Sequence, residues 1–143
     1  MTKQPNHNLL SLKTVIRTRG FEASKSFYVG LLNLEIVEEY DDGNGSRGLI
    51  LRFGDENSNA FMEISEILES HDYYQPPFSK AIENDKLDIQ LKTNDIGYWA
   101  KLLKEKQWPF RGPVPRPWGS QYLYLRDPDG LHIIIYQEKM SSG

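Results

Sequence analysis

The sequence predicts an α+β fold of two tandem βαβββ modules, whose curved mixed sheets surround a concave cleft. Two observations carry this prediction. The order strand, helix and three strands occurs twice, and segment 12–18, LKTVIRT, aligns without a gap on segment 87–93, LDIQLKT. Self-similarity at about half the chain length indicates two modules joined by a linker. The helices are few and amphipathic, so we expect them to cover the sheets instead of forming a core alone.

The first module is expected at about 12–65. Its helix is indicated by apolar or small residues at helical spacing in GFEASKSFYVGLL. The turns DDGNGSRG and GDENS contain residues that tolerate positive φ and separate its later strands. In order, the predicted elements are a strand at 12–18, the helix at 20–32 and strands at 34–40, 49–53 and 59–65.

The second module is expected at 87–138. Its helix, 95–106, has Asp95 near its start and lysines at its end, the charge order that a helix dipole favours. An extended segment around WPFRG follows, and then two strands, QYLYLR and the apolar LHIIIYQ, flank the turn DPDG. Both modules belong to one predicted domain, 9–138, with a linker at 66–86 and polar tails at 1–8 and 139–143.

Side chains alternate between the two faces of a strand, so each strand has one predicted helix-facing side. We expect Val15, Ile36, Ile89 and Leu91 on that side. The opposite side carries a mixture of acids, amides and aromatic rings that is too polar for a core and too aromatic for a plain solvent face. Such a surface is a candidate pocket. Its predicted members include Phe61, Glu63, Asp88, Gln90, His132, Ile134 and Tyr136.

Composition narrows the possible functions. The chain of 143 residues has a net charge of −3 with scattered basic residues, which disfavours a nucleic-acid partner. It has no cysteine, which excludes disulfides, thiolate nucleophiles and cysteine-based zinc sites. It shows neither a secretion leader nor an apolar run near the ~20 residues of a membrane span. We therefore expect a cytoplasmic protein with neither a nucleic acid nor a membrane as its partner.

The segments GFEASKSFYVGLLNLEIV and RPWG followed by YLYLRDPDGLHIIIY, within paired βαβββ modules, resemble the vicinal oxygen chelate superfamily. This superfamily comprises glyoxalases, bleomycin-resistance proteins and extradiol dioxygenases, and the resemblance covers about residues 9–138. It implies four metal-ligand positions, which fall on Thr14, Glu63, Asp88 and Ile134. Threonine and isoleucine do not supply the expected ligands, so we expect no metal cofactor.

The resemblance is greatest to the metal-free bleomycin-resistance proteins. It implies a homodimer that sequesters an aromatic or cationic small molecule, a role in antibiotic resistance, and no catalytic residues. Trp118 is expected to stack on the ligand and Arg116 to bind an anionic group. The full set of predicted ligand-binding residues is Trp118, Tyr136, Phe61, Glu63, Asp88, Gln90, His132 and Arg116.

Two alternatives remain open. The chain is instead an enzyme, a lyase, isomerase or dioxygenase, if Glu63, Asp88 and His132 together hold a divalent metal such as Zn, Ni, Mn or Fe. It is a protein-interaction module if the fold has been kept and the pocket lost.

Overall fold

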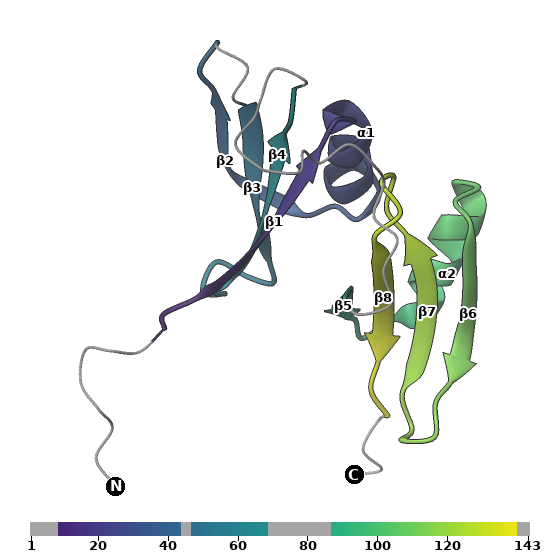
Figure 1. Ribbon diagram of the computed structural model, residues 1–143. Helices are drawn as coiled ribbons and strands as arrows, with labels where there is room; N and C mark the ends of the chain where they lie inside the picture. Colours follow the sequence, from purple (N-terminus) through teal and green to yellow (C-terminus); the bar gives the residue numbers. More distant parts are fainter. Residues whose placement is uncertain (1–8, 44–46, 69–86, 140–143) are drawn as a thin grey trace, which may run out of the picture. The chain divides into compact units, whose positions relative to one another are not determined.

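The computed structural model describes residues 9–43, 47–68 and 87–139, which form two four-stranded mixed sheets, each accompanied by a helix (Figure 1). The chain divides into two compact units, Met1–Ser79 and Lys80–Gly143. The predicted α+β class and the repeated βαβββ order are confirmed. Most of the predicted linker, 66–86, lies outside the described residues.

The first unit has the strand order β1-β4-β3-β2, in which β1 and β4 are parallel and the other neighbours antiparallel. Its helix begins as an α-helix and continues without a break as a π-helix. Ser24 on this helix donates a hydrogen bond to the buried Thr18 of β1 at 3.4 Å, so the helix covers the Thr18 side of the sheet. The elements are β1 (Leu12–Thr18), α1 (Phe21–Lys25), η1 (Ser26–Leu31), β2 (Glu35–Asp41), β3 (Arg47–Phe53) and β4 (Ala60–Glu66).

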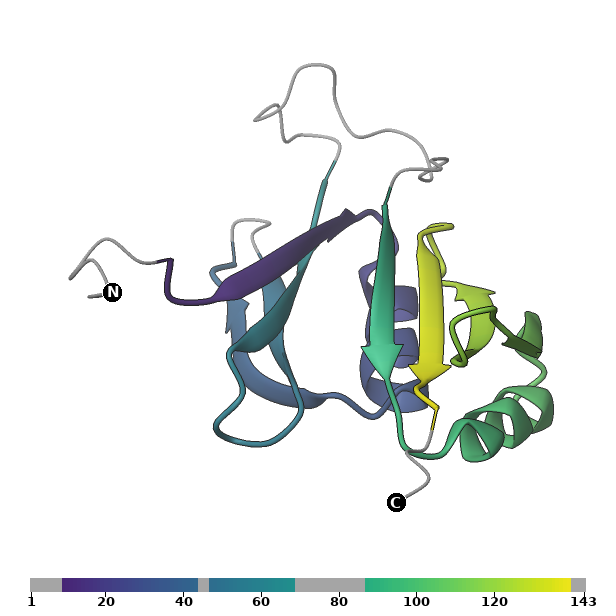
Figure 2. The ribbon, with the colours of Figure 1, turned by 90° about the horizontal axis from the view of Figure 1, so that it is seen from below.

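The second unit repeats this order as β5-β8-β7-β6, with β5 parallel to β8 (Figure 2). Its helix begins after Asp95, whose side chain accepts a hydrogen bond from the Tyr98 backbone N–H at 3.1 Å, as an N-cap should. The Ile96 N–H donates to the Gln137 side chain at 2.9 Å and so ties the helix to β8. The elements are β5 (Asp88–Lys92), α2 (Ile96–Glu105), β6 (Phe110–Pro115), β7 (Gln121–Arg126) and β8 (His132–Gln137).

Each sheet buries the side chains of one face against its own helix. This burial of apolar surface is the main stabilising contribution in either unit. In the first unit the buried set includes Phe27, Tyr28, Leu49, Leu51, Met62 and Ile64. In the second unit it includes Leu103, Leu123, Leu125, Ile133 and Ile135. The face of each sheet that lies opposite its helix is called the open face below.

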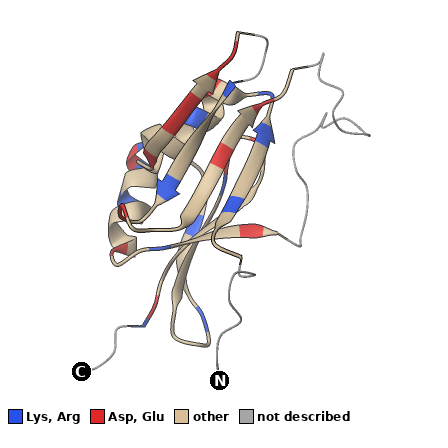
Figure 3. Cartoon of the chain, turned by 90° about the vertical axis from the view of Figure 1, so that its left-hand side faces the viewer, with Lys and Arg blue, Asp and Glu red and all other residues tan. Residues whose placement is uncertain are grey.

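Acidic and basic residues are interspersed along the strands and helices of both units (Figure 3). No helix in the described ranges is long and apolar enough to cross a membrane.

The turn between β7 and β8 depends on one buried carboxylate. Oδ1 of Asp127 accepts hydrogen bonds from the backbone N–H groups of Asp129 at 2.9 Å and Leu131 at 2.8 Å. The second acid of the turn, Asp129, differs, because its Oδ2 is buried without a hydrogen-bond partner. Asp127 therefore positions the start of β8.

We expect Asp127→Ala to lower the free energy of unfolding by about 2 kcal/mol, because one buried and one partly buried N–H group lose their acceptor. Asp129→Ala is the matched control in the same turn, and we expect it to change stability by less than about 0.5 kcal/mol. Urea unfolding followed by circular dichroism measures both values. Equal losses in the two variants would contradict this account of the turn.

Candidate functional site

The open face of the second unit collects side chains from all four strands of its sheet. Parallel pairing places Asp88 beside His132 and Gln90 beside Ile134. Antiparallel pairing places Tyr124 beside Ile134 and Tyr122 beside Tyr136. Neighbouring residues in register point to the same face, so acids, amides and aromatic rings share one surface. The predicted side-chain alternation in this unit is confirmed.

Four aromatic residues, Trp118, Tyr122, Tyr124 and Tyr136, form what we call the aromatic cluster. Tyr122 lies at its centre, with ring centroids 5.6 Å from Trp118, 5.9 Å from Tyr124 and 6.0 Å from Tyr136. The Trp118 ring packs edge-on against Tyr122, yet Trp118 is 59% exposed. Trp118 is thus held by its neighbours while much of its surface remains accessible to a ligand.

Two arginines lie against the cluster on its β6 side. The guanidinium of Arg116 is 5.0 Å from the ring centre of Trp118 and 5.9 Å from that of Tyr122. Arg111 of β6 lies 4.7 Å from the ring centre of Tyr124. These are cation–π distances, and such contacts orient both the cation and the ring.

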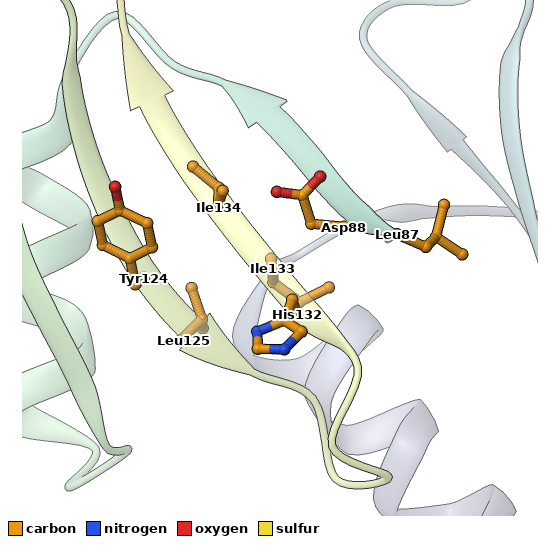
Figure 4. Close-up of a pocket in the computed structure, with 7 residues that line it drawn as sticks. All are labelled: Leu87, Asp88, Tyr124, Leu125, His132, Ile133 and Ile134. Carbon is orange, nitrogen blue, oxygen red and sulfur yellow. The ribbon is translucent and has the colours of Figure 1, made fainter. Parts of the chain in front are cut away.

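A hollow of about 320 Å³ adjoins the cluster at the β5 side of the same sheet. In Figure 4 the side chains of Asp88, His132, Ile134 and Tyr124 project from three neighbouring strands around it. Its volume is at the lower end of the range for small-molecule pockets. Tyr124 borders the hollow and also belongs to the aromatic cluster, so the two form one continuous candidate binding surface.

The open face of the first unit is organised around Glu63 of β4. Lys13 of β1 donates a hydrogen bond to Oε1 of Glu63 at 2.7 Å, and the Tyr40 hydroxyl of β2 donates to Oε2 at 2.8 Å. Both carboxylate oxygens therefore already have a partner within the unit. The ammonium of Lys13 also balances the charge of this half-buried acid.

Gly48 of β3 allows Tyr40 to reach Glu63. A Cβ atom at position 48 would meet the Tyr40 ring carbon Cζ at 2.5 Å and also the Tyr40 hydroxyl. The backbone oxygen of Ile64 would lie 2.5 Å away as well. The absence of a side chain on Gly48 thus makes room for the tyrosine to cross β3.

The three partners change one another's pKa values. Partial burial raises the pKa of Glu63, but hydrogen bonds from Lys13 and Tyr40 and the charges of Lys13 and Arg17 outweigh burial and hold it below 4.5. The hydrogen bond to Glu63 raises the pKa of Lys13 above 10.5. Burial is the main cause that raises the pKa of Tyr40 above 10.0. At neutral pH the group is therefore an ion pair with a protonated phenol.

One expectation about the first unit is wrong. Thr14 pairs in register with Met62, which is buried on the helix side, whereas Val15 pairs with Glu63 on the open face. Val15 is therefore not on the helix side, and Thr14 does not share a face with Glu63. The residues of β1 that share the face of Glu63 are Lys13, Val15 and Arg17.

The structure divides the predicted ligand-binding residues between the units. Those of the second unit lie on or beside one open face: Trp118, Arg116, Tyr136, Asp88, Gln90 and His132. Phe61 and Glu63 lie on the open face of the first unit, where Phe61 is half-buried and its ring centre is 5.7 Å from the Arg52 guanidinium. Their roles in binding stay predictions.

Sequence reasoning missed Tyr122, Tyr124, Lys13 and Tyr40. The alternation of tyrosine and leucine in QYLYLR already places both tyrosines opposite the buried leucines. The gapless alignment of 12–18 on 87–93 also pairs Lys13 with Asp88, and this would have identified Lys13. Nothing comparable in the sequence identifies Tyr40 as a partner of Glu63.

The residues that were expected to share a metal in the enzymatic alternative differ in their surroundings. Asp88 and His132 are register partners, whereas both oxygens of Glu63 are hydrogen-bonded by Lys13 and Tyr40. Within the described ranges, no three His, Cys, Asp or Glu side chains form a group that would hold a metal ion. In addition, Ile134 lies on the same face as Asp88 and His132, and its side chain has no atom that can coordinate a metal.

Comparison with known proteins identifies relatives of this fold. The sequence profile described as Glyoxalase/Bleomycin resistance protein/Dioxygenase superfamily matches residues 11–135. No curated protein matches the chain.

Solved structures of different function share the fold. TnmS3, an antibiotic binding protein from Streptomyces sp. CB03234, is 21% identical, with a TM-score of 0.65 over 93% of this chain and 100% of that one. Lactoylglutathione lyase from Agrobacterium tumefaciens is 17% identical, with a TM-score of 0.65 over 98% and 100%. The fosfomycin resistance protein FosX from Mesorhizobium loti is 15% identical, with a TM-score of 0.62 over 92% and 91%. At these identities the likeness concerns the fold alone.

The Lys13–Glu63 pair leads to a pH-dependent prediction. The pKa of Glu63 is lower in the folded state, so its stabilising contribution is present above pH 4.5 and is lost as the pH falls through the folded-state pKa. We expect Lys13→Met to raise the pKa of Glu63 and to lower the free energy of unfolding at pH 7 by up to about 1 kcal/mol. This difference should decrease as the pH falls through the folded-state pKa of Glu63.

Carbon-detected NMR titration of the Glu63 carboxyl and urea unfolding across a series of pH values from neutral to acidic measure these effects. Lys25→Met is the control, because its pair with Glu39 is longer, at 3.7 Å, and more exposed. A Glu63 pKa that does not move in Lys13→Met would contradict the prediction.

Proposed function

The chain belongs to the glyoxalase/bleomycin resistance protein/dioxygenase superfamily, and we propose that it is a member that binds a small aromatic molecule without a metal. Its action is stoichiometric sequestration and not turnover. The bleomycin-resistance proteins named in the family description motivate the further proposal that binding protects against a toxic compound such as an antibiotic.

The observation that carries this proposal is the aromatic cluster. A buried core would cover such rings, but Trp118 is largely exposed and the three tyrosines are half-buried on an open sheet face. Accessible aromatic rings fixed by edge-on packing provide flat surfaces at low entropic cost for a planar ligand. The adjoining hollow supplies depth, with Asp88 and His132 as polar groups that can orient the ligand.

The chemistry of the side chains supports binding without a metal. A catalytic divalent metal commonly has three protein ligands and an open position. On the first open face the ammonium of Lys13 already neutralises Glu63. On the second face Asp88 and His132 are accompanied by Ile134, which cannot coordinate a metal.

A metal-dependent lyase, isomerase or oxygenase is the second candidate. The observation in its favour is the pairing of Asp88 with His132 beside the hollow, since a carboxylate and an imidazole are common metal ligands and acid–base groups. This candidate requires at least one further ligand.

We also infer a homodimer. Each sheet has two edge strands. In the part of the chain that the structure describes, these are β1 and β2 in the first sheet and β5 and β6 in the second. Unpaired strand edges readily serve as association surfaces, and symmetric dimers are the commonest oligomers.

Elemental analysis distinguishes the two candidates. We expect protein purified without chelators or metal-affinity steps to contain well under one equivalent of Zn, Ni, Mn or Fe. We also expect added metals to leave the melting temperature unchanged, because too few ligands are available. A near-stoichiometric metal whose binding is lost in His132→Ala would reject the metal-free proposal.

Ligand binding tests the role of the aromatic cluster. The chain has three tryptophans, so Trp99→Phe/Trp108→Phe leaves Trp118 as the only indole reporter. We expect planar aromatic compounds to quench its fluorescence saturably, because they stack on or beside Trp118. Trp118→Ala in the otherwise native chain should weaken binding, measured by calorimetry, by about tenfold or more.

Leu102→Ala serves as the control for a general loss of packing, since Leu102 lies on α2, away from the open face. Equal affinity in Trp118→Ala and the native chain would show that the cluster is not the ligand site.

A further inference from the structure

We propose that the ligand is a planar aromatic acid, whose anionic group binds the guanidinium groups of Arg116 and Arg111. This inference rests on the proposed binding function and specifies the ligand's charge. It follows from how charges are arranged around the aromatic cluster.

The guanidinium groups of the two arginines lie over the rings of the aromatic cluster at cation–π distances. A guanidinium that stacks on an aromatic ring uses its flat face, while its N–H groups point outward in the plane. The guanidinium carbon of Arg116 lies over the rings of Trp118 and Tyr122, and that of Arg111 over the ring of Tyr124. The in-plane fork matches the two oxygens of a carboxylate, so an acid on the rings would meet preoriented donors.

Neither guanidinium has an acidic partner among the residues that the structure describes. By contrast, the lysine on the other side of this open face, Lys92, is paired with Glu138 at 3.0 Å. The Nε atom of Arg116 is also buried without a hydrogen-bond partner. A buried Nε is out of reach of a ligand, so an anionic group would bind the terminal N–H groups of Arg116, which have no acidic partner among the described residues.

Charges of both signs lie on this face. At the β5 edge, Asp88 is accompanied by Lys92, which is paired with Glu138. Arg126 of β7 lies in register with His132, and Arg111 lies on β6 at the opposite edge. The tyrosines of β7 and β8 occupy the strands between these two edges. A further cation, Lys139, lies against Gly119 in the turn that bears Trp118. The β6 side of the aromatic cluster therefore carries the arginines that have no acidic partner among the described residues, which favours an anionic substituent on that side.

Calorimetry with three compounds of the same ring system tests this proposal. The compounds are 2-naphthoate, 2-naphthamide and 2-naphthylmethylamine, which at pH 7 are an anion, a neutral molecule and a cation of similar shape. We expect 2-naphthoate to bind at least about tenfold more tightly than 2-naphthamide, as a charge-assisted hydrogen bond allows. We expect this preference to decrease as salt is added.

Two variants locate the effect. Arg116→Gln and Arg111→Gln should each weaken 2-naphthoate binding about fivefold to tenfold and leave 2-naphthamide binding within about twofold. Arg111 is exposed, so its variant tests the site even if Arg116→Gln is poorly folded. Lys101→Gln is the control, because it removes one positive charge from an exposed position on α2, outside the open face.

The outcomes separate this inference from the proposed function. If the amide or the amine binds as tightly as the acid, the charge assignment is wrong and the aromatic binding function stands. If the acid is preferred but Lys101→Gln reduces that preference as much as the arginine variants, overall charge is responsible and the assignment is again wrong. If none of the three compounds binds, both the inference and the proposed binding function fail.

Discussion

The parallel pairing of the first and last strand in each βαβββ unit is the constraint on which the rest of the structure depends. β1 pairs with β4 along both strands, and the whole of β5 pairs with β8, without a register shift. Because alternate side chains point to opposite faces, this one register decides which residues are buried under the helix and which share the open face. A slip by one residue would exchange the buried Met62 and Ile64 with Phe61 and Glu63.

The sequence was sufficient to predict the fold class, the order of elements and the open face of the second unit. There the apolar residues of β5 and β7 alternate with polar or aromatic ones, so the buried side is evident. In β1 the face of Val15 also carries the charged residues Lys13 and Arg17, whereas the face of Thr14 and Ile16 carries no charge. This alternation already favoured burial of the Thr14 side, but the apolar character of Val15 was given more weight, and the wrong face was predicted for Thr14 and Val15.

The interactions on the open faces were harder to predict because they depend on cross-strand geometry. In the sequence, Glu63 and Asp88 look equivalent, because each is an acid predicted on the open face of its own βαβββ unit. In the folded chain Glu63 is neutralised by Lys13 and hydrogen-bonded by Tyr40, whereas Asp88 borders a hollow. The two copies of the same architecture thus differ in what they present. The first satisfies its charge internally, and the second retains accessible rings and uncompensated arginines.

The passage of Tyr40 over Gly48 bears on how this sequence can evolve. A side chain at position 48 is incompatible with the present place of the tyrosine ring, and loss of the tyrosine removes one of the two donors to Glu63. Positions 40, 48 and 63 are therefore linked, and a change at one alters which residues the others tolerate. Homologous sequences that carry a larger residue at position 48 should also lack the tyrosine, so these positions should covary as a group.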